Sequence, residues 1–280
     1  MDKIHSVEKH FAQRYGPLFF AVGAFLITWL TGLFVVLSSH ADLVNGAQRL
    51  KNPLLISFPV ALTLILIGGY GPAFAALGVT AVESGLAGVR ALRAQFLRWR
   101  VGLGWYALAL LGPSLIGLLA VGLYVLVTRT VPEQWWMLPN LLRIGLVLLG
   151  PWGEELGWRG YALPKLQSRW GAFGASGLVA LMWFSWHQWP LFTPAREPNV
   201  DWVGLVVFLG YLFAISVLMT WLYNSTAGSL PIAWAAHAGL NLMGTMVPLI
   251  FVAVMFSLAA ALVLLLNGPQ TLSHVEIDSQ

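Results

Sequence analysis

Long apolar segments with very few charged residues constrain the fold of this chain more than any other feature. Of its 280 residues, 58% are hydrophobic and only 9% are charged, whereas about 25% are charged in a typical soluble domain. Several of these segments are long enough for a helix to cross the roughly 30 Å hydrocarbon core of a bilayer. Because backbone groups in lipid must be hydrogen-bonded within their own segment, helices are favoured. We therefore predict an all-α, polytopic membrane protein.

The apolar segments predict a bundle of about eight transmembrane helices that forms a single membrane domain over residues 1–280. A polar tail, 1–16, precedes the first span, and a loose polar tail, 267–280, follows the last. The second span should bend, because glycines and a proline interrupt it near residue 70. The expected spans are 17–37, 54–82, 104–127, a span from 139 into the motif described below, 171–189, 202–223, 229–247 and 248–266.

The positions of the basic residues predict the orientation of the chain and limit its partners. Four arginines between residues 90 and 100 alternate with apolar side chains, a pattern suited to lying on an anionic membrane surface. Together with the basic residues of 1–16 and 165–169 they outnumber those of the other loops, so we expect both termini in the cytoplasm. The basic excess is small and gives no reason to expect a nucleic-acid partner. The chain has no cysteine, which excludes disulfides and thiolate chemistry, and nothing in it indicates an oligomeric state.

Two adjacent glutamates lie in the segment GPWGEELGWRGYAL, residues 150–163, within the fourth predicted span. Glu154 and Glu155 are the acids expected inside the membrane, whereas the other acids, Glu83 among them, are expected in termini or loops. A carboxylate at the bilayer centre costs about 2.5–3.5 kcal/mol on insertion scales, so such a pair marks a functional site. The histidines expected within or at the end of a span are His187 and His237.

Helical spacing predicts different surroundings for the two glutamates. Glu155 is four residues before Arg159, the spacing at which the two side chains pair on one helix face. Glu154 borders a stripe of small residues, at which the spans 171–189 and 229–247 can bring the histidines close. His237 and Asn241 also share a face, as do Trp183 and His187. The stripe consists of Gly150, Gly153, Gly157 and Gly160.

Taken together, these residues resemble the EExxxR, FxxxH and HxxxN motifs of the CPBP (CAAX protease and bacteriocin-processing, or Abi) family of intramembrane endopeptidases. The order of the motifs and their helices are similar too, with a tryptophan at the family's phenylalanine position. The stretches GPAFAALGVTA, RWRVGLGWY and GWRGYALPKLQ resemble bacterial members, so we expect a bacterial cell membrane. The residues that carry the resemblance are Glu154, Glu155, Arg159, Trp183, His187, His237 and Asn241.

The resemblance implies hydrolysis of a peptide bond in a membrane-associated protein or peptide, in CAAX-type or bacteriocin-type processing or in self-immunity, with 139–247 as the catalytic core. In a glutamate mechanism, Glu154 and His187 would activate water while His237 and Asn241 hold the oxyanion. In a metal mechanism, His187, His237 and Glu154 would bind Zn²⁺. Family members have been described both ways. Because Asn241 is a better oxyanion donor than zinc ligand, the sequence slightly favours catalysis without a metal or other cofactor.

Two other classes of function use the same residues. A transporter or proton relay could bind a cation with the Glu and His groups, but the sequence lacks the inverted repeats that such proteins often have. A silent scaffold or immunity protein could retain the fold without catalysis. A Glu155–Arg159 pair by itself could be purely structural, and interfacial histidines without a role are common. The complete, ordered set of motifs favours the endopeptidase.

Overall fold

A computed structural model of the chain describes residues 2–38, 64–136, 141–192 and 200–273, with side chains described for 15–37, 67–136, 148–192 and 200–273. Within these ranges the secondary structure is helical, which confirms the predicted all-α class. Four short π or 3₁₀ segments accompany the α-helices: η2 (Leu64–Gly69), η3 (Gln95–Leu97), η4 (Leu156–Ala162) and η5 (Trp189–Phe192). The α-helices are α1 (Asp2–Ser38), α4 (Gly71–Ala94), α5 (Leu103–Thr128), α6 (Leu141–Glu155), α7 (Leu163–His187), α8 (Trp202–Ser225), α9 (Leu230–Leu242) and α10 (Leu249–Asn267).

The eight described α-helices match the predicted number, and five helical segments are long and apolar enough to cross a membrane. The other three, α6, α7 and α9, carry the motif residues except Arg159, which lies in η4. α6 and α9 have 15 and 13 residues, fewer than the roughly 20 that a spanning helix needs. The part of the predicted second span before residue 64 lies outside the described residues. The five segments are Tyr15–Leu37, Gly71–Leu97, Leu103–Thr128, Trp202–Ser225 and Leu249–Asn267.

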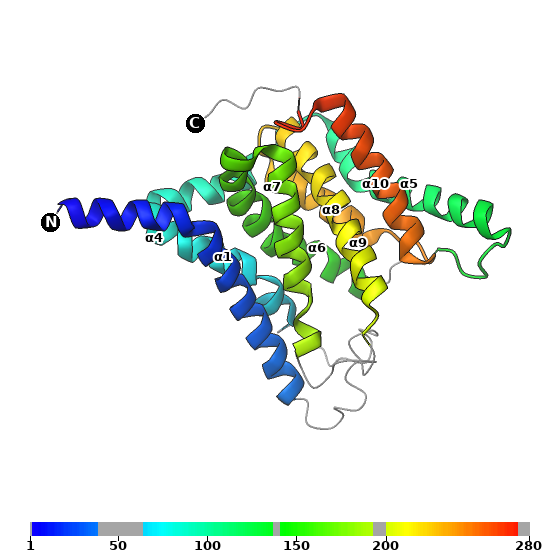
Figure 1. The fold of residues 1–280 in the computed structure, drawn as a ribbon, viewed down its shortest axis with the longest axis horizontal. Helices are drawn as coiled ribbons and strands as arrows, with labels where there is room; N and C mark the ends of the chain where they lie inside the picture. The colour runs from blue at the N-terminus through cyan, green and yellow to red at the C-terminus, as the bar shows by residue number, and fades with distance from the viewer. Residues whose placement is uncertain (1, 39–63, 137–140, 193–199, 274–280) are drawn as a thin grey trace.

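The helices α6, α7 and α9 lie among the other helices of the bundle. Figure 1 shows α1 beside α4 at one edge of the molecule and α5 with α10 at the other, with α7, α8 and α9 between them. α6 packs on α4 and α9, and η4, which follows it, packs on α4 and α7. All seven residues of η4 are buried. The segment that begins the motif is therefore enclosed by several other helices.

The chain does not pass through the motif as a regular α-helix. α6 ends at Glu155 and continues as the π-helix η4, which carries Arg159 and leads into α7. Within α7, Gly171 has φ 64° and ψ 173°, a conformation open to glycine, so the helix changes direction there. π segments are rare and are frequent at functional sites. This local irregularity could not be predicted from hydropathy.

The glycine stripe packs mainly on α4, not on α7 and α9 as predicted. A Cβ atom at Gly153 would lie 2.6 Å from Cγ of Tyr70, and one at Gly157 would lie 2.5 Å from Cβ of Pro72. Gly160 alone faces α9, where a Cβ would lie 3.3 Å from Leu230 Cδ1. The prediction of close approach was correct, but helical spacing cannot identify which neighbour approaches.

Glu83 corrects a second expectation, because it is buried and not in a loop. α4 continues well past the predicted end of the span, and Glu83 is 4% exposed. It accepts a hydrogen bond from the Tyr161 hydroxyl at 2.9 Å and forms an ion pair with Lys165 at 2.9 Å. These contacts join α4 to η4 and α7. The π-helix brings Tyr161 to Glu83, a contact that sequence spacing does not reveal.

The glycine stripe offers a direct test of this packing. Gly153→Ala should lower stability by about 1–3 kcal/mol, because the added methyl group collides with the backbone and ring of Tyr70. Gly150→Ala in the same helix is the control, since no atom lies within 4 Å of a Cβ there. Thermal unfolding of the purified variants in detergent measures both effects. Equal melting temperatures for the two variants would contradict the close approach of α6 and α4.

Candidate functional site

A buried ion pair lies at the centre of the site. Glu155 and Arg159 are both 0% exposed, and Arg159 Nη1 lies 3.0 and 3.1 Å from the two carboxylate oxygens of Glu155. The predicted pairing at i, i+4 is confirmed. A buried pair gains from the low local dielectric only if its hydrogen bonds are satisfied, since both charges lose their water. The positions of the groups around the pair are therefore important to its stability.

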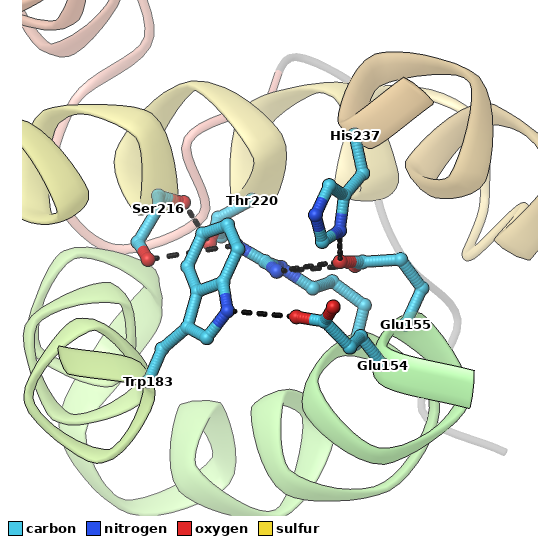
Figure 2. A network of polar contacts seen from close by, with 7 residues as sticks. Glu154, Glu155, Trp183, Ser216, Thr220 and His237 are labelled. Carbon is cyan, nitrogen blue, oxygen red and sulfur yellow. Dashed lines mark hydrogen bonds and ion pairs between the residues drawn. The ribbon is translucent and has the colours of Figure 1, made fainter. Parts of the chain in front are cut away.

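His237 of α9 makes the third contact of this cluster. Its Nδ1 lies 2.7 Å from Glu155 Oε1, and the residue is 4% exposed. Because the carboxylate pairs with Arg159 and accepts hydrogen bonds, Nδ1 is the donor, which leaves Nε2 for another partner. Figure 2 shows Glu155 directed towards His237. Glu155 thus orients a histidine as well as pairing with Arg159.

Glu154 has different surroundings from its neighbour. It is half-buried, and its Oε2 accepts a hydrogen bond from Trp183 Nε1 at 2.9 Å. Figure 2 shows the carboxylate turned towards Trp183, away from the ion pair of Glu155. In the described part of the chain, Glu154 forms no ion pair. The two adjacent carboxylates are therefore chemically distinct: one is held by a cation, and the other by a single neutral donor.

Trp183 of α7 contacts four of the motif residues and is the site residue that sequence reasoning undervalued. It is 3% exposed. Besides donating to Glu154, its ring lies 4.8 Å from Arg159 Cζ and 5.1 Å from the centroid of His237. The ring centroid of His187 is 5.9 Å away. Its position four residues before His187 indicated in the sequence that it belongs to the site, but did not reveal the hydrogen bond from its indole to Glu154.

His187 and Asn241 complete the set at its periphery. His187 Nδ1 donates to the carbonyl oxygen of Trp183 at 2.8 Å, so Nε2 carries the lone pair of the neutral ring. Trp186 and Phe208 pack edge-on against this imidazole. Asn241 follows His237 by one turn of α9 and is half-buried. Among the described residues its amide makes no hydrogen bond, so it can donate to a substrate.

Hydroxyl groups of α7 and α8 form a chain of hydrogen bonds that begins at Arg159. Arg159 Nη2 donates to Ser216 Oγ at 3.5 Å, and the carbonyl oxygen of Ser216 accepts from Thr220 at 2.7 Å. Thr220 Oγ1 in turn accepts from Ser176 Oγ at 2.8 Å. Figure 2 shows Ser216 and Thr220 on the far side of Trp183 from Glu154. Such hydroxyls could not be assigned from sequence, because Ser and Thr are common in membrane helices.

The candidate zinc ligands do not form a metal-binding group in the described part of the chain. No set of three His, Asp or Glu side chains there is arranged to hold a metal ion. His187 and His237 donate their Nδ1–H groups to a carbonyl and to Glu155, which leaves the Nε2 atom of each ring for another partner. Glu154 is bonded to an indole. Within the described residues, the site thus lacks an assembled set of three ligands, although each histidine keeps one ring nitrogen able to bind a metal.

An apolar pocket lies beside this site and not within it. Its walls come from α5, α8, α9 and α10, and it borders α9 through Ala236 and Leu240. These two residues lie on one side of the face of α9 that carries His237. The pocket lining contains none of the motif residues.

The described residues define a helical membrane protein with a buried Glu–Arg–His site. Comparison with known proteins shows which family and which relative it resembles. Residues 134–243 match the family described as type II CAAX prenyl endopeptidase Rce1-like. The chain is 34% identical over 131 residues to CAAX prenyl protease 2 of Methanococcus maripaludis. This match covers 42% of the chain and 48% of the relative, so the chain spans about half the length of that curated protein.

The resemblance inferred from the motifs is therefore confirmed: residues 134–243 are similar to the Rce1-like family. All six predicted site residues lie within that segment. A membrane family and several long apolar helices together support integral membrane localisation.

The two glutamates should differ in their effect on stability. Glu155→Gln leaves the buried Arg159 guanidinium without its counter-charge, a change that typically costs about 3–5 kcal/mol. Glu154→Gln retains a carbonyl oxygen that can accept from Trp183 Nε1, so its stability should stay near that of the unmodified protein. Thermal unfolding in detergent compares them. Equal losses of stability from the two substitutions would contradict this division of roles.

Proposed function

We propose that this protein is an intramembrane endopeptidase that hydrolyses a peptide bond near the carboxyl terminus of a membrane-associated protein, with a CAAX-type substrate. The observation that carries the proposal is the separation of the two glutamates. Glu155 is neutralised by Arg159, whereas Glu154 is left as a half-buried carboxylate beside two histidines. The similarity to a CAAX prenyl protease supports the substrate class.

Glu154 and His187 are proposed to activate the attacking water. A general base must accept a proton within hydrogen-bond reach of the nucleophile. Glu154 has one carboxylate oxygen that is not bonded to Trp183, and His187 has an Nε2 lone pair. Glu154 takes one proton of the water, and the water oxygen forms a bond to the scissile carbonyl carbon. The C–N bond then breaks, and the proton passes from Glu154 to the departing amine.

His237 and Asn241 are proposed to stabilise the oxyanion of the tetrahedral intermediate. Glu155 fixes the His237 ring through Nδ1 and supplies negative charge beside it, so a proton on Nε2 can be donated to the substrate. This is the arrangement in which a buried carboxylate orients a catalytic histidine. The Asn241 amide lies one turn further along α9. Removing one oxyanion donor typically lowers kcat by about 10²–10³-fold.

Catalysis is tested with the purified protein in proteoliposomes and a farnesylated CAAX peptide. Glu154→Gln should lower kcat by at least about 10²–10⁴-fold, the usual contribution of a general base. Glu133→Gln, at an exposed glutamate between α5 and α6, is the matched control and should retain full activity. Product is measured by mass spectrometry. Full cleavage by the Glu154 variant, or cleavage of a bacteriocin precursor in place of the CAAX peptide, would contradict the proposal.

Metal independence is a separate part of the proposal. It is supported by the absence of a three-residue metal group among the described residues and by Asn241, whose amide is a better oxyanion donor than zinc ligand. Activity should therefore survive prolonged dialysis against a strong chelator, and added Zn²⁺ should not raise it. Metal content by mass spectrometry is the accompanying measurement. Loss of activity on dialysis that Zn²⁺ restores would assign the reaction to a metalloendopeptidase.

A further inference from the structure

A basic segment borders the site and has no role in the proposed reaction. Gly85 interrupts α4 with φ 62° and ψ −160°, so the chain turns after the part of the helix that holds Glu83. The residues that follow, 86–103, are called here the basic collar. Its arginines are exposed, and so are several of its large apolar side chains. These side chains are Arg90, Arg93, Arg98 and Arg100, together with Leu86, Leu97, Trp99 and Leu103.

The inner face of the collar is fixed to the rest of the protein. Leu92 is 5% exposed. The rings of Phe96 and Trp99 lie 4.9 and 6.0 Å from that of Trp152, which is two residues before Glu154. The Trp152 ring also stacks on Trp234, three residues before His237, at 4.9 Å. The collar is therefore packed on α6, and through Trp152 it reaches α9.

Hydrogen bonds join the collar to the two elements that hold the buried cluster. Gln95 Nε2 donates to the carbonyl oxygen of Gly160 in η4 at 3.2 Å, and Gln95 Oε1 accepts from Tyr223 at 2.8 Å. Ser229 Oγ, at the start of α9, donates to the carbonyl oxygen of Arg98 at 2.7 Å. Any force that orders the collar therefore acts on the segments that carry Arg159 and His237.

Three of the four arginines of the collar lack partners within the described protein. Arg90, Arg93 and Arg100 form no ion pair or side-chain hydrogen bond with the described residues, whereas Arg98 donates to Ala227. Exposed apolar side chains alternate with these arginines. An acidic soluble protein would satisfy the charges but not the leucines, whereas an anionic bilayer surface satisfies both.

We propose that the basic collar binds the headgroups of anionic phospholipids, and that this binding stabilises η4 and the start of α9. The arginines contact phosphate groups while Leu86, Leu97 and Leu103 enter the acyl region of the same leaflet. The exposed arginines act additively, each strengthening binding to an anionic surface by about fivefold. The inference concerns the stability of the fold and does not depend on peptidase activity.

The test uses nanodiscs of pure phosphatidylcholine and nanodiscs in which one third of the lipid is phosphatidylglycerol. The melting temperature of the full chain should rise by several degrees in the anionic discs. Hydrogen exchange in 156–162 and 229–242 should slow as well. The triple variant Arg90→Gln, Arg93→Gln, Arg100→Gln should lose most of that rise, while it melts with the unmodified protein in neutral discs, because all three side chains are exposed.

Controls separate binding from a general effect of charge. Arg129→Gln removes one exposed arginine outside the collar and should leave the response to anionic lipid unchanged, whereas Arg100→Gln should weaken it. High salt should weaken the response of the unmodified protein. An equal rise for the triple variant, no rise for the unmodified protein, or saturation of the collar by an acidic protein in neutral discs would overturn the inference. Failure of peptide cleavage would leave it intact.

Discussion

The buried contact between Glu155, Arg159 and His237 is the interaction on which the rest of the site depends. An arginine and a glutamate with no exposed surface are stable only when each charge is compensated. The compensation comes from three helices: α6 supplies the carboxylate, α9 the histidine, and α8 a hydroxyl behind the guanidinium. A polar cluster of this kind tolerates few alternative packings, because moving any one helix would leave a charge without a partner.

Trp183 gives Glu154 surroundings that differ from those of Glu155. Its indole N–H is a neutral group that donates a hydrogen bond to Glu154, while the ring of the same side chain lies over Arg159. The two carboxylates therefore do not compete for one cation, although they are neighbours in the sequence. The π-helix η4 begins immediately after them and places Arg159 in contact with both Glu155 and the tryptophan. Local backbone irregularity and one aromatic side chain thus distinguish two residues of the same chemistry.

Polar contacts at the edge of the bundle join η4 to its neighbouring helices. Glu83, Tyr161 and Lys165 join α4 to η4, and Gln95 of the basic collar bonds the carbonyl of Gly160 in the same π-helix. η4 is therefore held by Glu155 through Arg159, and by η3 and α4 through Gly160 and Tyr161. π segments are rare and mostly limited to a single turn. Contacts with neighbouring elements hold this one in place.

The sequence by itself determined the all-α membrane class, the Glu155–Arg159 pair and the likeness to CAAX endopeptidases. These follow from composition, from residue types in order and from helical spacing, all of which are local along the chain. Only the tertiary structure decided that His237 bonds Glu155, that Trp183 donates to Glu154, that the glycine stripe meets α4 and that Glu83 is buried. The physical reason is that such contacts join residues far apart in sequence. Which helix faces reach one another depends on the packing of the whole bundle.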